Sequence, residues 1–183
     1  MTAAVSTFEV VDLVDAQAAE FATERSRLAR VYRLVPQKIF GLLGDLFAGM
    51  ALAFLNRHAR WFAHRAVWFR GAQADLENLP LGRLLDPDDH LRTSLDRMES
   101  GLAEIVGASQ RLAKETEIIR GRRGMFSAAL LKLAAAADEM RQEVRHFKGA
   151  LQAHDANVDA IRRARRICSS PSELDEALDI ALL

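Results

Sequence analysis

Aromatic side chains recur at every seventh position in one part of the chain. They are Phe40, Phe47, Phe54, Trp61 and Trp68. Seven residues make nearly two turns of α-helix, so a helix carries these rings on one slowly drifting stripe. A strand would place successive rings of the series on opposite faces. The pattern therefore predicts one long helix over residues 37–70.

Three further helices are predicted by apolar residues spaced alternately three and four positions apart. The first covers residues 11–35 and ends at Pro36, because the residue before a proline is biased away from helix. The others cover 88–119 and 126–168. All four segments have the pattern of helices that pack along their length.

The breaks between these segments have recognisable signals. A linker at 71–87 contains two prolines, and its last two residues, Asp86 and Pro87, are suited to the start of the next helix. A glycine-flanked turn occupies 120–124. Residues 170–173 read Ser-Pro-Ser-Glu, a capping box that predicts a short acidic helix at the end of the chain.

The expected fold is all-α, an elongated four-helix bundle built from two antiparallel, coiled-coil-like hairpins plus a short C-terminal helix. Residues 1–70 form the first hairpin, and 88–168 form the second, longer one. The linker 71–87 joins them, and 169–183 form the acidic tail helix.

Folding each hairpin about its turn predicts which residues meet. In the second hairpin, a turn at residue 122 places Leu91 near His154. In the first, a turn at Pro36 brings Asp12 and Asp15 opposite the region of Arg57 and Arg60. Those acids would then neutralise part of a basic run, because residues 25–70 contain nine basic residues and one acid.

Charge and cysteine content narrow the class of protein. The chain has 25 basic and 25 acidic residues, so it has no bulk electrostatic attraction to nucleic acid or to an anionic membrane. The lone Cys168 excludes an intramolecular disulfide framework and a multi-cysteine zinc site. The N-terminal residues lack the pattern of a secretory signal, so a cytoplasmic location is expected.

Two alternatives to a bundle helix were weighed for the aromatic-striped segment. Residues 39–55 are long enough, at the lower limit, to span a bilayer, but Asp45 lies within them and the apolar period continues to Trp68. Membrane association through 39–70 is therefore the alternative. Nucleic-acid binding through arginine-rich helix faces is a second alternative, and it requires uncompensated charge.

No catalytic motif is recognisable, and neither a cofactor nor a metal site is predicted. Glu143 and His146 match half of a di-iron bundle signature, and the missing half favours a solvated helix edge instead. Asp88, Asp89, His90 and His154 converge if the hairpin register is right. A buried histidine bound to a carboxylate is the expected outcome there.

Polar residues interrupt the apolar stripes at five positions. They are Arg25, Ser109, Thr116, His154 and Arg165. Such interruptions lower stability and often fix the register or the number of partners.

The function that fits these observations is a non-enzymatic scaffold or adaptor that binds a protein partner, another copy of itself, or both, through helix–helix contacts. The residues predicted to make these contacts are Phe54, Trp61, Trp68, Val158, Ile161, Arg162, Arg165, Arg166, Leu174, Leu178 and Leu182.

Overall fold

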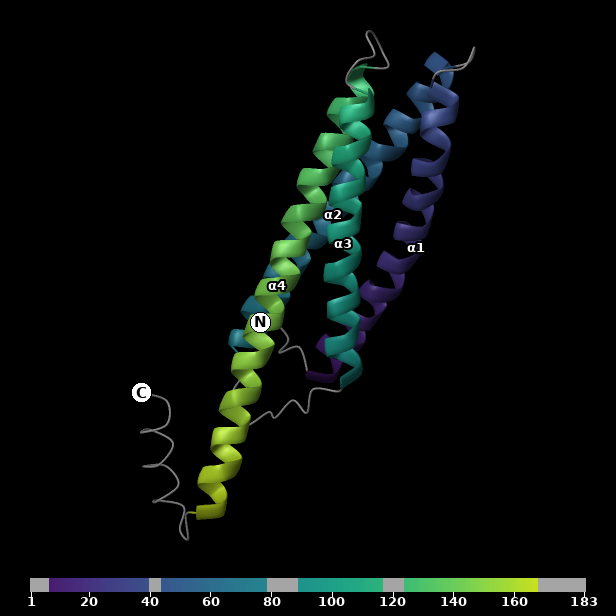
Figure 1. The fold of residues 1–183 in the computed structure, drawn as a ribbon. Helices are drawn as coiled ribbons and strands as arrows, with labels where there is room; N and C mark the ends of the chain where they lie inside the picture. Colours follow the sequence, from purple (N-terminus) through teal and green to yellow (C-terminus); the bar gives the residue numbers. More distant parts are fainter. Residues whose placement is uncertain (1–6, 40–43, 79–88, 117–123, 168–183) are drawn as a thin grey trace.

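Four helices make up the part of the chain that the computed structural model describes, residues 7–39, 44–78, 89–116 and 124–167. They are α1 (Thr7–Ile39), α2 (Gly44–Glu77), α3 (Asp89–Thr116) and α4 (Gly124–Ile167), and these ranges contain no strand (Figure 1). The prediction of an all-α protein is confirmed. Asp86, Pro87, the turn after residue 120 and the predicted tail helix lie outside the described residues.

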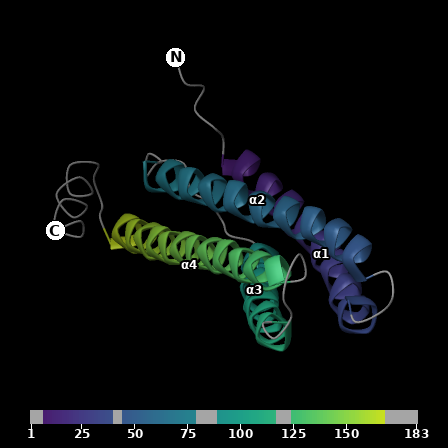
Figure 2. The same ribbon diagram turned by 90° about the horizontal axis from the view of Figure 1, so that it is seen from above.

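Helix α4 packs extensively against both α2 and α3, whereas α1 has smaller contacts with α2 and α3. Figures 1 and 2 show α2 and α4 side by side, with α3 against α4 and α1 on the far side of α2 and α3. The helices therefore follow one another around the core in the order α1, α2, α4, α3. The contact between α2 and α4 was not predicted from the sequence.

Ion pairs in the first half of α3 and a hydrogen bond near its end join α3 to α4. Arg92 pairs with Asp155. These two residues directly follow Leu91 and His154, which the sequence predicts to lie close together. Farther along α3, Ser127 of α4 donates a hydrogen bond to the carbonyl of Ala113 (3.0 Å).

A cluster of charges at the middle of this contact centres on Glu99 of α3. Lys148 Nζ lies 2.7 Å from one Glu99 oxygen, and Arg145 binds the other. These hydrogen bonds, first from Lys148 and then from Arg145, hold the pKa of the Glu99 carboxyl below its usual value. Asp96 also binds Lys148 (2.5 Å).

The contact of α1 with α2 differs in register from the prediction. Helix α1 continues through Pro36 to Ile39, so the chain reverses later in the sequence. As a result, Glu20 and Glu24 of α1, rather than Asp12 and Asp15, contact the basic part of α2. Asp15 lies 3.3 Å from Nδ1 of His90 on α3 instead.

Helix α2 also extends beyond its predicted end at residue 70, to Glu77 in the predicted linker. Ala72 and Leu76 are buried there and continue the apolar spacing, and the first proline of the linker is Pro80. The helix therefore continues as long as its apolar side chains pack against the core.

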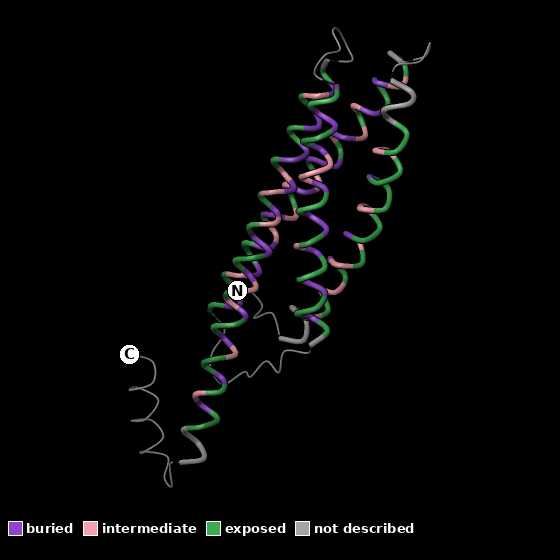
Figure 3. The backbone as a smooth tube through the Cα atoms, viewed as in Figure 1, coloured by how far each residue is buried: buried purple, intermediate pink, exposed green. Residues whose placement is uncertain are grey.

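The centre of the core on α2 lies one residue beyond the aromatic stripe. Leu55, Phe62 and Phe69, with Ala48 and Leu76 in the same heptad row, are buried (Figure 3). The stripe residues Phe47, Phe54, Trp61 and Trp68 are half-buried and pack against this core from its edge, and Phe40 lies outside the described residues.

Two neighbouring helices explain this displacement of the core. On the side of α4, Phe69 meets Phe147 edge to face at 6.0 Å between ring centroids. On the side of α1, Phe62 packs against Phe21 at 6.5 Å. Since α2 is buried from two sides, its core row runs between them, and the stripe lies toward α1.

Candidate functional site

The three aromatic residues predicted to bind a partner are engaged within the chain. Phe54, Trp61 and Trp68 are half-buried against the core. Trp61 Nε1 donates a hydrogen bond to Glu20 of α1 (2.9 Å), and Phe54 stacks on His58 at 4.0 Å between ring centroids. Trp61 thus forms part of the contact between α1 and α2.

The predicted contact residues on α4 are divided between the interior and the surface. Val158 and Ile161 are buried within the chain. Arg162 is exposed, and its Nη1 lies 3.7 Å from Oδ1 of Asp159. The remaining residues, which lie outside the described side chains, are Arg165, Arg166, Leu174, Leu178 and Leu182. A role of all these residues in binding a partner stays a prediction.

Two glutamates of α1 neutralise part of the basic run on α2. Glu20 accepts hydrogen bonds from Trp61 and from Arg65 Nη2 (2.6 Å). Partial burial raises the pKa of Glu20, but these bonds and the charge of Arg65 outweigh it, so the pKa lies below its usual value. Glu24 lies 2.6 Å from Nε2 of the buried His58. Helix α1 therefore binds α2 through these polar bonds as well as through the apolar contact of Phe21 with Phe62.

The arrangement around Glu143 corrects the prediction of a solvated edge. Its side chain is only 10% exposed, whereas His146 is 63% exposed. Arg70 of α2 donates to Glu143 from Nε (3.1 Å) and Nη2 (2.5 Å), and this bond raises the pKa of the Arg70 guanidinium. The reason is the neighbouring α2, which covers this side of α4.

The predicted cluster of acids and histidines is only partly assembled. His90 reaches Asp15 of α1, and its neighbour Asp88 lies outside the described residues. His154 is buried, and its Nε2 has no hydrogen-bond partner among the described residues. Oδ1 of the adjacent Asp155 is also buried without a partner. The described residues contain no group of three or more potential ligands that could hold a metal ion.

We expect that replacing His154 with leucine raises the free energy of unfolding by about 1 kcal/mol, because it removes an unsatisfied polar atom from the interior. Urea unfolding followed by circular dichroism measures this change. The matched control is His146→Leu on the exposed face of the same helix, with an expected change within about 0.5 kcal/mol. A loss of stability in His154→Leu would show that the imidazole makes a favourable contact.

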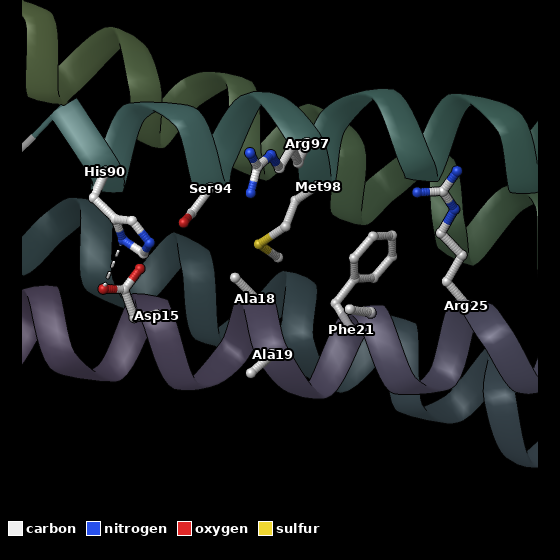
Figure 4. A pocket seen from close by; sticks show the side chains of 10 residues that line it. Asp15, Ala18, Ala19, Phe21, Arg25, His90, Ser94, Arg97 and Met98 are labelled. Carbon is white, nitrogen blue, oxygen red and sulfur yellow. Dashed lines mark ion pairs between the residues drawn. The ribbon is translucent and has the colours of Figure 1, made fainter.

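A cavity of about 370 Å³ lies between α1 and α3 (Figure 4). Helix α1 faces it with three alanines, Ala18, Ala19 and Ala22, and α3 faces it with Ser94 and Met98 among others. Small residues on α1 leave the space unfilled. The ion pair of Asp15 with His90 lies at one end of the lining in Figure 4, and Arg25 lies at the other.

Beside this cavity, α1 and α3 approach each other closely at Gly101. A Cβ atom added there would lie 2.9 Å from the ring of Phe21 and 3.2 Å from the side chain of Arg25. Phe21 is buried and packs against Phe62, so its ring has little room to move. Glycine at this position therefore sets the spacing of the two helices.

We expect Gly101→Ala to destabilise the fold by about 1 kcal/mol. The overpacking penalty of about 1–3 kcal/mol exceeds the gain in helix propensity of about 1 kcal/mol. Gly149→Ala is the matched control, because a Cβ there meets nothing within 4 Å and should stabilise the fold by about 0.5–1 kcal/mol. Equal effects of the two substitutions in thermal unfolding would contradict the close approach at Gly101.

Exposed apolar side chains gather at one end of the bundle, which we call the apolar end. Of the seven large hydrophobic residues exposed in the described part of the chain, five lie where α1 ends and where α2 and α4 begin, the upper end in Figure 1. They are Leu34, Leu46, Met50, Met125 and Leu131. Leu46 and Met50 are each 67% exposed.

Sequence reasoning missed the apolar end because it assigned nearly the whole surface of residues 39–55 to burial. A signal was present on α2. Leu46, Met50 and Ala53 lie on one face, and the same face continues with the exposed Arg57 and Arg60. A helical face that carries basic residues normally faces solvent. The apolar residues on the first two turns of this same face are therefore exposed as well.

None of the helices, over the residues whose placement is described, combines the length and the apolar character needed to cross a membrane.

No protein family, curated protein or solved structure matches the chain in sequence or in fold.

Proposed function

We propose that this chain is a non-enzymatic adaptor or scaffold that acts through helix–helix contacts and associates with a second copy of itself. In this proposal the four helices form an elongated bundle of two antiparallel hairpins. The apolar end is the surface through which two bundles meet.

The observation that carries the proposal is the gathering of exposed hydrophobic side chains at the apolar end. Scattered exposed hydrophobics are ordinary on a protein surface, whereas a group of them at one place is typical of an interaction site. Leu46 and Met50 are one helical turn apart on α2, and Met125 and Leu131 lie on the first two turns of α4.

Charge also favours self-association over the nucleic-acid alternative. The formal net charge of the chain is zero at pH 7, so two copies do not repel each other at long range. Arg65 is paired with Glu20 and Arg70 with Glu143, which leaves fewer unpaired cations on α2 for phosphate groups.

Analytical ultracentrifugation of the full chain over a range of concentrations tests the proposal. We expect an average mass that rises with concentration from the monomer mass of 20.3 kDa toward a multiple of it. A constant monomer mass up to concentrations of about 100 μM would contradict self-association, since weak specific interfaces still associate in this range.

Substitution at the apolar end tests where the copies meet. We expect the double variant Leu46→Gln and Met50→Gln to weaken self-association about tenfold or more, because it removes two exposed apolar side chains from the contact. Val67→Gln is the matched control, because Val67 is 59% exposed on the same helix but lies away from the apolar end. Equal effects of the two variants would contradict the assigned surface. Flotation of the monomer with liposomes, lost in the double variant, would favour the membrane alternative instead.

A further inference from the structure

We propose that the cavity between α1 and α3 binds a small amphipathic carboxylate, with the carboxylate at Arg97 and Ser94 and the apolar body against Ala18, Phe21 and Met98. This site is independent of the apolar end and of self-association. Its volume of about 370 Å³ lies within the range of small-molecule sites, roughly 300–1,000 Å³.

The first argument is an exposed cation that has no ion-pair partner among the described residues. Arg97 lines the cavity and forms no ion pair or hydrogen bond with the described residues. The nearby charges are already matched, since Arg25 pairs with Glu104 and Asp96 pairs with Lys148. Arg25 and Arg97 also line a second hollow of about 320 Å³ on the same side of α3. An anion in this region therefore meets a guanidinium that has no counter-charge.

The second argument is the hydroxyl of Ser94, a mostly buried residue that lines the cavity. Ser94 is only 8% exposed, and it forms no hydrogen bond with the described residues. It lies one helical turn before Arg97. In Figure 4 the Ser94 side chain is directed toward the space between the two helices, and the Arg97 guanidinium lies beside α3 above it. The Ser94 hydroxyl therefore keeps a hydrogen-bond donor that an oxygen of a bound carboxylate can accept.

The third argument concerns the body of the ligand. Below Arg97 in Figure 4, Met98 of α3 and Ala18 and Phe21 of α1 form an apolar surface. At the far end, Asp15 pairs with His90. A second anionic group would be repelled by the Asp15 carboxylate, which favours a single carboxylate on an aliphatic or aromatic body.

Methyl NMR of methionine in the full chain tests the site, with octanoate as the probe. The five methionines give one signal each, and Met98 alone lines the cavity among the described ones. We expect a saturable shift of the Met98 methyl and no shift at Met50, Met125 or Met140. Shifts at Met50 and Met125 without one at Met98 would show adsorption to the apolar end and would overturn the proposal. The absence of any saturable shift would overturn it as well.

Two variants and one neutral probe identify the chemistry. We expect Arg97→Gln to raise the Kd for octanoate about tenfold, because it removes a charge-assisted hydrogen bond. Arg111→Gln, at an exposed position on the same helix outside the cavity lining, should leave the Kd unchanged. Ala18→Leu should abolish the Met98 shift by filling the cavity. Octanol that binds as tightly as octanoate would overturn the assignment of the carboxylate to Arg97.

Discussion

Truncating Phe62 to alanine should lower the free energy of unfolding by about 3–5 kcal/mol, among the largest effects expected for a single substitution in the described part of the chain. The ring of Phe62 is fully buried in the row that forms the centre of the core on α2, and it packs against Phe21 of α1. The loss combines the transfer free energy of the ring with the cavity that it leaves. Urea unfolding at neutral pH measures it.

The matched control is Phe54→Ala, which removes the same side chain from the aromatic stripe. Phe54 is half-buried at the edge of the core, so its loss should lower stability by less than half as much. The comparison tests whether the core row lies one residue beyond the stripe. If Phe54→Ala were as destabilising as Phe62→Ala, the stripe itself would be the centre of the core.

Raising the pH above 10 should destabilise the fold through Tyr32, by up to about 2–3 kcal/mol at pH 12. Burial raises the pKa of Tyr32 from its ordinary value of 10.0 to about 12, although its hydrogen bond with Ser109 acts in the opposite direction. Between these two values the folded chain keeps the phenolic proton and the unfolded chain releases it. The stability that is fully present below pH 10 is therefore lost as the pH rises toward 12.

Tyr32 is the only tyrosine in the chain, so the absorbance of tyrosinate reports its titration without interference from another. We expect a midpoint of about 12 in the folded protein and about 10 in denaturant. Tyr32→Phe should remove this part of the pH dependence. It should also lower stability at neutral pH, because the buried Ser109 hydroxyl loses its partner at 2.6 Å. A folded-state midpoint near 10 would contradict the partial burial of Tyr32 against the core.

Periodicity predicted the helices well because each of them has an apolar face long enough to override local signals. The same reasoning misplaced helix ends where the core continued past a break in the pattern. Pro36 lies within α1 near its end, and α2 continues to Glu77, where Leu76 is still buried. Proline removes one donor from a helix, and near a helix end this has little effect on the remaining hydrogen bonds.

What the sequence could not predict is which helices become neighbours. An apolar stripe indicates that one face of a helix is buried, but it does not identify the helix that covers this face. Helix α2 is covered from two sides, by α1 and by α4. That is why Glu143 binds Arg70 rather than facing solvent, and why Trp61 forms a hydrogen bond with Glu20 of α1. The pairing of His90 with Asp15 has the same origin, because it depends on α1 lying beside α3.

The two candidate surfaces could not be predicted from the sequence for the same reason. The apolar end and the α1–α3 cavity are both places where small or exposed residues fail to meet a partner, and a single sequence does not show such mismatches. Ala18 and Ser94 have no unusual pattern of their own. They become informative only because the packing of α1 on α3 places them across an unfilled space.

The central claim, that copies of this chain associate through the apolar end, is tested most directly by hydrogen–deuterium exchange at low and at high protein concentration. We expect peptides that cover Leu46 and Met50 to exchange more slowly at high concentration, while those that cover Val67 do not change. Exchange that is independent of concentration everywhere, or that slows only outside the apolar end, would contradict the account.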